Sequence, residues 1–199
     1  MIKVGITGGI GVGKSFVANI IEKMGFPVFY SDRVAKGLMN SDLELISLIK
    51  KEFGDDVYAS NNLIKNKKLS SLAFRDNKAL KNLNSLVHPF VKSNFKKWCI
   101  NQNSKIVFKE AAILFESKSN IDLDRIICVS ANKNIRIDRI IKRDNRSKEE
   151  ILKIISNQMD QKEKEKLSDY VIFNDEKNSI ILQLTDILKQ LEKVFYYEK

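Results

Sequence analysis

The chain has 199 residues, 43% of them hydrophobic, and a formal net charge of +10 at pH 7. This length and apolar content predict one domain with room for an insertion. They argue against a membrane-spanning protein, because no apolar run approaches the roughly 20 residues that cross a bilayer. The lysines are scattered and do not form the basic stripe of a nucleic-acid binder. In the absence of a secretory signal pattern, we expect a cytoplasmic protein with two buried thiols, Cys99 and Cys128.

The first predicted element is a short strand that runs into a glycine-rich loop. Residues 2–6 are apolar and β-branched, and the segment after them matches G-x-x-x-x-G-K-S/T: Gly8, Gly9, Ile10, Gly11, Val12, Gly13, Lys14, Ser15. In such a loop the backbone N–H groups turn toward an anion, and the following helix, here from Phe16 onward, points its positive end at the same anion. The order predicts a phosphate-binding loop for a nucleoside triphosphate, in which Lys14 reaches the β and γ phosphates and Ser15 is a ligand of Mg²⁺.

The second predicted strand, residues 27–29, is followed closely by a carboxylate. Asp32 stands at the edge where parallel α/β sheets bind their ligands. Transfer of a phosphoryl group to an alcohol needs a carboxylate there, to orient the hydroxyl and accept its proton. Asp32 equally fits the N-cap of a helix that begins at Arg33. Both interpretations stay open at this point.

A long helical region separates the second strand from the third. Amphipathic patterns predict the helices Leu43–Phe53, Ala79–Val87 and Phe90–Ile100, with breaks at Phe53-Gly54 and His88-Pro89. A simple crossover between parallel strands needs far fewer residues, so we interpret these helices as an insertion. His88 is the only histidine of the chain, and nothing near it in the sequence marks it as a base.

Three further strands complete the predicted sheet, at residues 105–110, 125–130 and 170–173. Glu110 ends the first of them, and it either helps to hold Mg²⁺ through water or caps the next helix. The last helix has one apolar face, which we expect to pack on the sheet: Ile180, Leu184, Ile187, Leu191, Val194. The alternation of strands and helices predicts an α/β fold with a parallel sheet flanked by helices.

Four arginines stand close together between the last two strands. On one helix, Arg136, Arg139, Arg143 and Arg146 would cover an arc of roughly 80°. A solvated basic face is the usual meaning of such a run. This chain otherwise prefers lysine, however, and arginine is suited to bidentate contacts with phosphate. We therefore favour a lid that neutralises charge on the transferring phosphoryl group and excludes water.

In their order and spacing, these segments resemble the dephospho-coenzyme A kinases. The resemblance covers most of the chain and lies in the following segments: 7–15, 31–36, 86–89, 111–116, 136–144, 158–159 and 168–174. The loop alone is common to a superfamily. The combination of His88-Pro89 with Leu114-Phe115-Glu116 and the arginine segment is much more specific.

The resemblance implies ATP-dependent phosphorylation of the ribose 3′-hydroxyl of dephospho-coenzyme A, the last step of coenzyme A synthesis. ATP would be the donor, Mg²⁺ the metal, and no obligatory protein partner is implied. It also implies a single P-loop kinase domain. Its parts would be a core (about 1–35, 103–130 and 168–199), a helical acceptor-binding insertion (about 36–102) and a helical lid (about 132–166).

The same resemblance assigns roles to individual residues. Within the nucleotide-binding loop, the stretch from Gly11 to Phe16 would bind the ATP phosphates, with Lys14 acting in catalysis. Asp32 would be the base, and the lid would contribute Arg139 and Arg143. The acceptor pocket would be shaped by His88, Leu114, Phe115 and Glu116, and Asn174 would lie near the donor nucleotide.

The chain departs from the family pattern at four positions. Tyr30 stands where the family often has a first aspartate, which puts a metal or substrate role for that carboxylate in doubt. Asn66 stands where an arginine is frequent, and a neighbouring lysine would replace it only as a point charge. Phe16 and Ala112 replace a frequent threonine and a frequent proline.

Two other functions fit the phosphate-binding loop. One is another small-molecule kinase, with a nucleotide or a shikimate-like acceptor. The other is a GTPase switch, which needs a guanine-selecting Asn-Lys-x-Asp segment. The nearest string, at residues 132–135, lacks the aspartate, so the switch is disfavoured.

Overall fold

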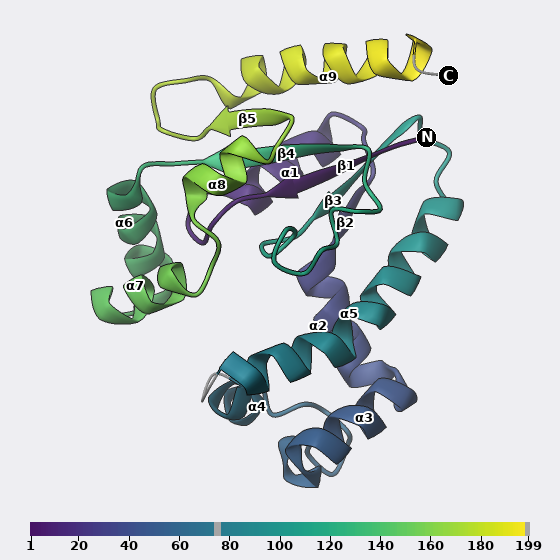
Figure 1. Ribbon diagram of the computed structural model, residues 1–199, viewed down its shortest axis with the longest axis vertical. Helices are drawn as coiled ribbons and strands as arrows, with labels where there is room; N and C mark the ends of the chain where they lie inside the picture. The colour runs from purple at the N-terminus through teal and green to yellow at the C-terminus, as the bar shows by residue number, and fades with distance from the viewer. Residues whose placement is uncertain (74–76, 198–199) are drawn as a thin grey trace. The chain divides into compact units, whose positions relative to one another are not determined.

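The structure is a computed structural model that describes residues 1–73 and 77–197 (Figure 1). The chain divides into two compact units, one made of Met1–Tyr30 with Gln102–Lys199 and the other of Ser31–Asn101. The first unit contains the sheet, and the second is mainly helical. The predicted core and insertion also include residues 198–199 and 74–76, which lie outside the described residues.

The sheet of the first unit has five parallel strands in the order β2-β3-β1-β4-β5. These strands are β1 (Ile2–Thr7), β2 (Val28–Tyr30), β3 (Ile106–Glu110), β4 (Arg125–Ser130) and β5 (Tyr170–Phe173). All five strands predicted from the sequence are confirmed, and so is their parallel arrangement. Because the sheet is parallel, the carboxyl ends of all its strands meet at one edge, and Glu110 is in register with both Ile6 and Tyr30 there.

The core of this unit lies on one face of the sheet, under helices α1 (Lys14–Lys23) and α9 (Ile180–Tyr197). Alternate residues of β1 point to that face, as do buried residues of the two helices: Ile2, Val4, Ile6, Val17, Ala18, Ile21, Leu184, Ile187, Leu191. The expected apolar face of the last helix is thereby confirmed. A smaller cluster of Ala111, Leu114 and Ile126 forms apart from it.

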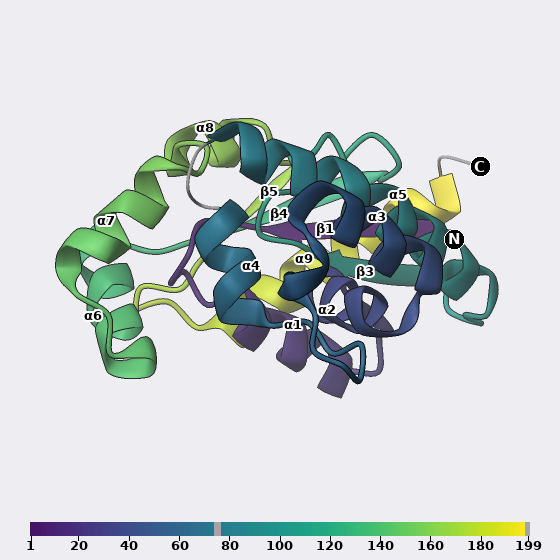
Figure 2. The ribbon, with the colours of Figure 1, turned by 90° about the horizontal axis from the view of Figure 1, so that it is seen from below.

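Three helices follow β4: α6 (Lys133–Asp144), α7 (Lys148–Ser156) and α8 (Gln161–Lys166). Each helix has an N-cap residue whose side chain accepts a hydrogen bond from a backbone amide of the first turn. These residues are Asn132 for α6, Ser147 for α7 and Asp160 for α8. α6 and α7 lie side by side in both ribbon views (Figure 1 and Figure 2). α6 ends at Asp144 because Asn145 adopts the left-handed conformation. Arg146 is therefore beyond this helix, and the expected four-arginine face on one helix is wrong for its last member.

The second unit contains α2 (Ser31–Ser41), α3 (Leu43–Phe53), a short 3₁₀ helix η1 (Asp55–Val57), α4 (Asn66–Ala73) and α5 (Asn77–Ile100). The helix over Leu43–Phe53 and its end at Gly54 are confirmed. Tyr58 is buried, and its hydroxyl donates to the carbonyl oxygen of Met39 at 2.8 Å. Burial raises the pKa of Tyr58 to about 12, so the phenol stays a hydrogen-bond donor.

The predicted break at His88-Pro89 is wrong, because α5 continues through Pro89. A proline inside a helix removes one backbone hydrogen bond and crowds the preceding turn. Here the apolar stripe Val87, Val91, Phe95 and Cys99 continues at four-residue spacing on both sides and is buried throughout. Burial of that stripe offsets the local cost.

In the described residues, none of the helices combines the length and the apolar character that a membrane span requires.

Candidate active site

The glycine-rich loop connects β1 to α1 in the conformation that its glycines permit. Gly13 is the N-cap of α1 and has a φ of 91°, in the left-handed region. A Cβ atom there would stand 2.2 Å from the side-chain nitrogen of Asn174. A Cβ at Gly8, also at positive φ, would stand 2.3 Å from the carbonyl oxygen of Val129. Both positions therefore need glycine for backbone shape and for close approach.

Lys14, in the first turn of α1, is buried and is only 9% exposed. Its ammonium group donates to the carbonyl oxygen of Gly9 at 3.3 Å, so it lies over the loop that it belongs to. A cation in this place and the N-terminus of α1 both attract an anion. The loop region thus has the charge and the backbone geometry of a phosphate site.

Ser15 and Glu110 bring two oxygen ligands together beside the loop. The Ser15 hydroxyl donates to Glu110 Oε1 at 3.4 Å, and Glu110 lies at the carboxyl end of β3, as predicted. Oxygen ligands suit Mg²⁺, which in kinases takes few protein ligands and completes its shell with phosphate and water. No cluster of three or more acidic, histidine or cysteine side chains suited to a metal occurs within 1–73 and 77–197. The oxygen atoms of Ser15 and Glu110 are of the kind that suits a hard divalent cation.

Three of the four arginines lie on α6, and the structure separates their roles. Arg136 is only 5% exposed, and its Nε donates to the carbonyl oxygen of Ile10 at 2.8 Å. Burial lowers the pKa of Arg136 from its ordinary value. The alternative that these arginines form a solvated face is wrong for Arg136. In contrast, Arg143 is 64% exposed and pairs with Asp144, whose pKa the hydrogen bond from Arg143 lowers.

Arg139 connects α6 with the segment after β5. Its Nη2 donates to Asn174 Oδ1 at 3.3 Å and to Glu176 Oε1 at 3.2 Å. Asn174 in turn donates from Nδ2 to the carbonyl oxygen of Val12 at 2.8 Å. Arg139 Nη1 is buried and has no hydrogen-bond partner in the part of the chain that the structure describes. Two predicted site residues, Arg139 and Asn174, are therefore in contact with each other, and Asn174 also contacts the loop.

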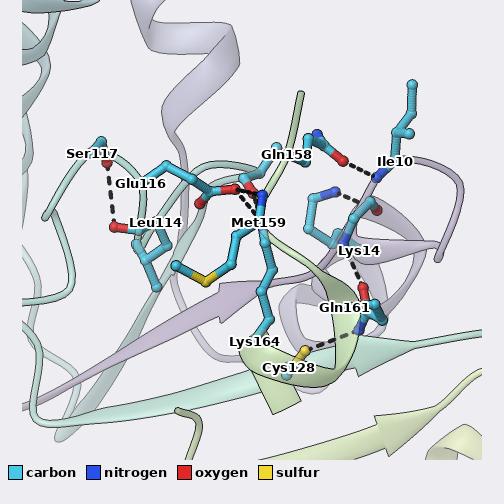
Figure 3. Close-up of polar contacts among 12 residues, drawn as sticks. Ile10, Lys14, Leu114, Glu116, Ser117, Cys128, Gln158, Met159, Gln161 and Lys164 are labelled. Atoms are coloured by element: carbon cyan, nitrogen blue, oxygen red, sulfur yellow. Dashed lines mark hydrogen bonds and ion pairs between the residues drawn. The ribbon is translucent and has the colours of Figure 1, made fainter. Parts of the chain in front are cut away.

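Two glutamines that the sequence interpretation gave no role bind the loop backbone. Gln158, just after α7, accepts from the Ile10 amide at 2.8 Å, and Gln161, the first residue of α8, accepts from the Gly9 amide at 2.9 Å (Figure 3). Gln161 Nε2 donates to Cys128 Sγ at 3.2 Å. Burial raises the pKa of Cys128 to about 11, so this sulfur is a neutral thiol at pH 7. Both cysteines are buried and free, as expected.

The segment Leu114-Phe115-Glu116 follows β3 and makes its contacts within the first unit. Leu114 is fully buried in the small cluster with Ala111 and Ile126, and Phe115 packs partly against it. Glu116 forms an ion pair of 2.7 Å with Lys164, which is completely buried in α8, and accepts from the Met159 amide at 3.0 Å (Figure 3). All six residues of α8 are polar. Nothing in the sequence distinguishes the buried Lys164 from the other lysines of this helix, so the contact was not predicted.

Asp32 and His88 belong to the second unit. Asp32 lies in the first turn of α2, which begins at Ser31, so the alternative that it caps a helix starting at Arg33 is wrong. Its carboxylate there is favourably placed for the positive end of the helix dipole. His88 lies half-buried in the middle of α5. Phe16 is 60% exposed on α1, in the first unit.

Comparison with known families identifies the chain. Residues 2–179 match the family model described as dephospho-CoA kinase. The chain belongs to the dephospho-CoA kinase family. A dephospho-CoA kinase of Chlorobaculum tepidum is 40% identical to it, over 96% of this chain and 92% of that protein. One of Bacteroides fragilis is 35% identical over 98% and 96%.

Solved structures agree with this fold. The crystal structure of TT1252 from Thermus thermophilus superimposes with a TM-score of 0.79 at 30% identity, with 96% of each chain covered. The dephospho-CoA kinase from Campylobacter jejuni has a TM-score of 0.67 at 24% identity, over 99% of this chain and 98% of that chain. At that identity the second likeness concerns the fold alone, which is that of a P-loop kinase.

Proposed function

We propose that this protein transfers the γ-phosphoryl group of ATP to the ribose 3′-hydroxyl of dephospho-coenzyme A, giving coenzyme A and ADP. The observation that carries the proposal is the family match along residues 2–179, within which the phosphate loop, the arginine helix and Asp32 all lie. We place the reaction in the cytosol, as the last step of coenzyme A synthesis.

The donor nucleotide is bound by the glycine-rich loop and by residues next to it. Backbone amides from Gly11 to Phe16 bind the phosphates, and Lys14 moves from the Gly9 carbonyl to the β and γ phosphates. Ser15, with Glu110 next to it, would hold Mg²⁺, which neutralises charge on the β and γ oxygens. Asn174 lies against the loop and assists in holding the nucleotide.

The acceptor side needs a base and charge stabilisation. The 3′-oxygen attacks the γ-phosphorus, the bond to the β-γ bridging oxygen breaks, and the hydroxyl proton passes to Asp32. Arg139 offers its unpartnered Nη1, and Arg143 its exposed guanidinium, to the oxygens of the transferring group. In this proposal the residues 132–166 act as the lid.

For the acceptor, we propose contacts to His88 and to the segment Leu114-Phe115-Glu116, as the family resemblance implies. Phe115 is partly exposed, so part of its side chain is accessible to a ligand, and His88 is half-buried. Leu114 and Glu116 act through packing and through the ion pair with Lys164, which fix the course of that segment.

A direct assay tests the proposal. The protein is incubated with ATP, Mg²⁺ and dephospho-coenzyme A, and the acceptor is analysed by mass spectrometry for one added phosphoryl group at the 3′ position. Parallel incubations contain shikimate or a nucleoside as acceptor, or GTP as donor. Transfer to shikimate or a nucleoside in preference to dephospho-coenzyme A would overturn the acceptor assignment, and GTP turnover without any acceptor would favour the switch alternative.

A further inference from the structure

The dipeptide Gly9-Ile10 has side-chain partners on all four of its backbone polar groups. Gln161 accepts from the Gly9 amide at 2.9 Å, and Gln158 accepts from the Ile10 amide at 2.8 Å. Arg136 donates to the Ile10 carbonyl at 2.8 Å, and Lys14 donates to the Gly9 carbonyl at 3.3 Å. A loop of this kind usually leaves such groups to solvent or ligand. Here protein side chains determine where they point.

Three of these four partners come from one stretch of chain, residues 136–161, which crosses from α6 through α7 to α8. The same stretch contains the buried cluster of Ile137, Ile140 and Ile151, against which Ile10 of the loop packs. The contact of this stretch with the loop is therefore both apolar and polar. Its hydrogen bonds are to Gly9 and Ile10, in the first half of the loop.

The amide of Gln161 is fixed in one orientation by its neighbours. Its nitrogen faces three acceptors, Val129 O at 3.2 Å, Glu165 Oε1 at 3.3 Å and Cys128 Sγ at 3.2 Å. Glu165 also accepts from the Ser130 hydroxyl at 2.6 Å, which holds its carboxylate in place. A flipped amide would place oxygen against oxygen, so the Gln161 oxygen must point to Gly9.

The fixed backbone of Gly9 also affects the position of Lys14, which binds the Gly9 carbonyl oxygen. The Gly9 amide is held by Gln161 while the Gly9 carbonyl accepts from Lys14 and, at 3.4 Å, from the Val12 amide. A shift of the Gly9 backbone, on either side of its Cα, would therefore move the acceptor of the Lys14 ammonium group and the turn that leads into the phosphate-binding amides. Close tolerances of this kind matter, because misplaced charge loses most of its stabilising effect.

We propose that Gln161, assisted by Gln158, is a positioning residue that fixes the Gly9-Ile10 backbone and thereby sets Lys14 and the phosphate-binding amides for the nucleotide. In this proposal both glutamines act through the loop backbone that they bind. This inference rests on the proposed use of the loop for ATP. It adds that residues 136–161 shape the donor site through the loop backbone, in addition to any role of Arg139 and Arg143.

The test is nucleotide binding by Gln161→Met, which keeps the length of the side chain and removes its hydrogen bonds to Gly9, Cys128, Val129 and Glu165. The dissociation constant for Mg·ADP is measured by calorimetric titration without acceptor, and KM for ATP and for dephospho-coenzyme A are measured separately. Loss of the contacts to Gly9 and Val129 should weaken Mg·ADP about fivefold to tenfold. KM for ATP should rise in parallel while KM for the acceptor stays constant. A purely structural role would lower the active fraction and leave the dissociation constant unchanged.

Two further variants decide the outcome. Gln158→Met loses one contact and should weaken Mg·ADP by about twofold to fivefold, and it serves as the test if Gln161→Met does not fold. Gln190→Met, an exposed glutamine on α9, is the matched control and should bind as the wild type does. Unchanged Mg·ADP binding by folded Gln161→Met, or an equal loss in Gln190→Met, would overturn the inference. Wild-type protein that does not bind Mg·ADP would instead refute the proposed function.

Discussion

In the proposed reaction, Asp32 accepts the proton of the acceptor hydroxyl. Asp32 lies in the first turn of α2. Asparagine has nearly the same side-chain shape as aspartate, but its amide cannot accept the proton. We therefore expect Asp32→Asn to lower kcat by about 10²-fold to 10⁴-fold, with the affinity for Mg·ADP nearly unchanged. Steady-state kinetics and titration measure the two quantities. Asp186→Asn, at an exposed position of α9, is the control. Near-normal turnover of the Asp32 variant would show that another group takes the proton.

Two glycines with nearly the same positive φ allow the cost of backbone strain to be distinguished from the cost of a steric clash. Gly13 and Gly25 have φ values of 91° and 92°, but a Cβ at Gly13 would meet Asn174 at 2.2 Å whereas one at Gly25 meets nothing within 4 Å. Gly25→Ala should lower the free energy of unfolding in urea by about 1–2 kcal/mol from conformational strain alone. Gly13→Ala should cost more than this and should also weaken Mg·ADP. Equal losses of stability would mean that Asn174 simply moves aside.

At the residue scale the sequence located the loop well and its partners poorly. Gly8 to Ser15 form a contiguous motif whose spacing implies its own geometry, and Asp32 follows a recognisable strand. Arg136 belonged to a visible cluster, but only tertiary packing distinguishes its buried guanidinium from the exposed one of Arg143. Gln161 lies in a polar segment where one glutamine resembles any other, so no local pattern reveals its contact with Gly9.

At the scale of the elements, helix α5 contains a proline, Pro89, in its interior. The side chain of Pro89 is exposed, so it contributes little to packing. Pro89→Ala restores a backbone donor in the helix interior, so the free energy of unfolding should rise by about 1–3 kcal/mol. Urea titration measures it, and Lys96→Ala on an exposed turn of the same helix controls for helix propensity. A loss of stability would mean that the backbone around Pro89 is bent in a way that Ala does not tolerate.

α8 is attached to the segment after β3 by the ion pair between Lys164 and Glu116. Glu116→Ala leaves the ammonium of a completely buried lysine with the carbonyl oxygen of Ala112, at 2.8 Å, as its one hydrogen-bond acceptor among the residues that the structure describes. We expect a loss of about 3 kcal/mol in the free energy of unfolding. The exposed ion pair of Lys68 with Asp56 gives the control, because Asp56→Ala should have no measurable effect. Equal effects of the two substitutions would contradict the structural role of the buried pair.

At this scale the strands were predicted almost to the residue, since each is a short run rich in β-branched or aromatic residues. The breaks between helices were less predictable. Proline is a strong local indicator of a helix end, yet the buried stripe through Val87 and Val91 outweighs it. α4 (Asn66–Ala73), which the sequence interpretation did not include, is short and mostly polar, and it buries only Leu69 and Ala73.

For the whole molecule, the net charge of +10 bears on how an anionic nucleotide approaches. Excess positive charge raises the local concentration of anions, and added salt screens it. We expect kcat/KM for ATP to fall by about twofold to tenfold between about 20 mM and about 200 mM salt, with kcat at saturating ATP nearly constant. Initial rates over a salt series measure this. A value of kcat/KM that does not depend on salt would show that long-range attraction contributes nothing to capture.

The position of β1 in the sheet has a consequence for the order in which the chain folds. β1 is made first and carries the nucleotide loop at its end, but its two neighbours, β3 and β4, begin only at Ile106 and Arg125. Pairing between strands that are far apart in the sequence is slow. A long loop must close, at a cost in conformational entropy, before the strand contacts can offset that cost. During synthesis, the strand that bears the loop therefore waits for more than half of the chain to leave the ribosome. Until then its apolar residues are exposed to chaperones and to other nascent chains.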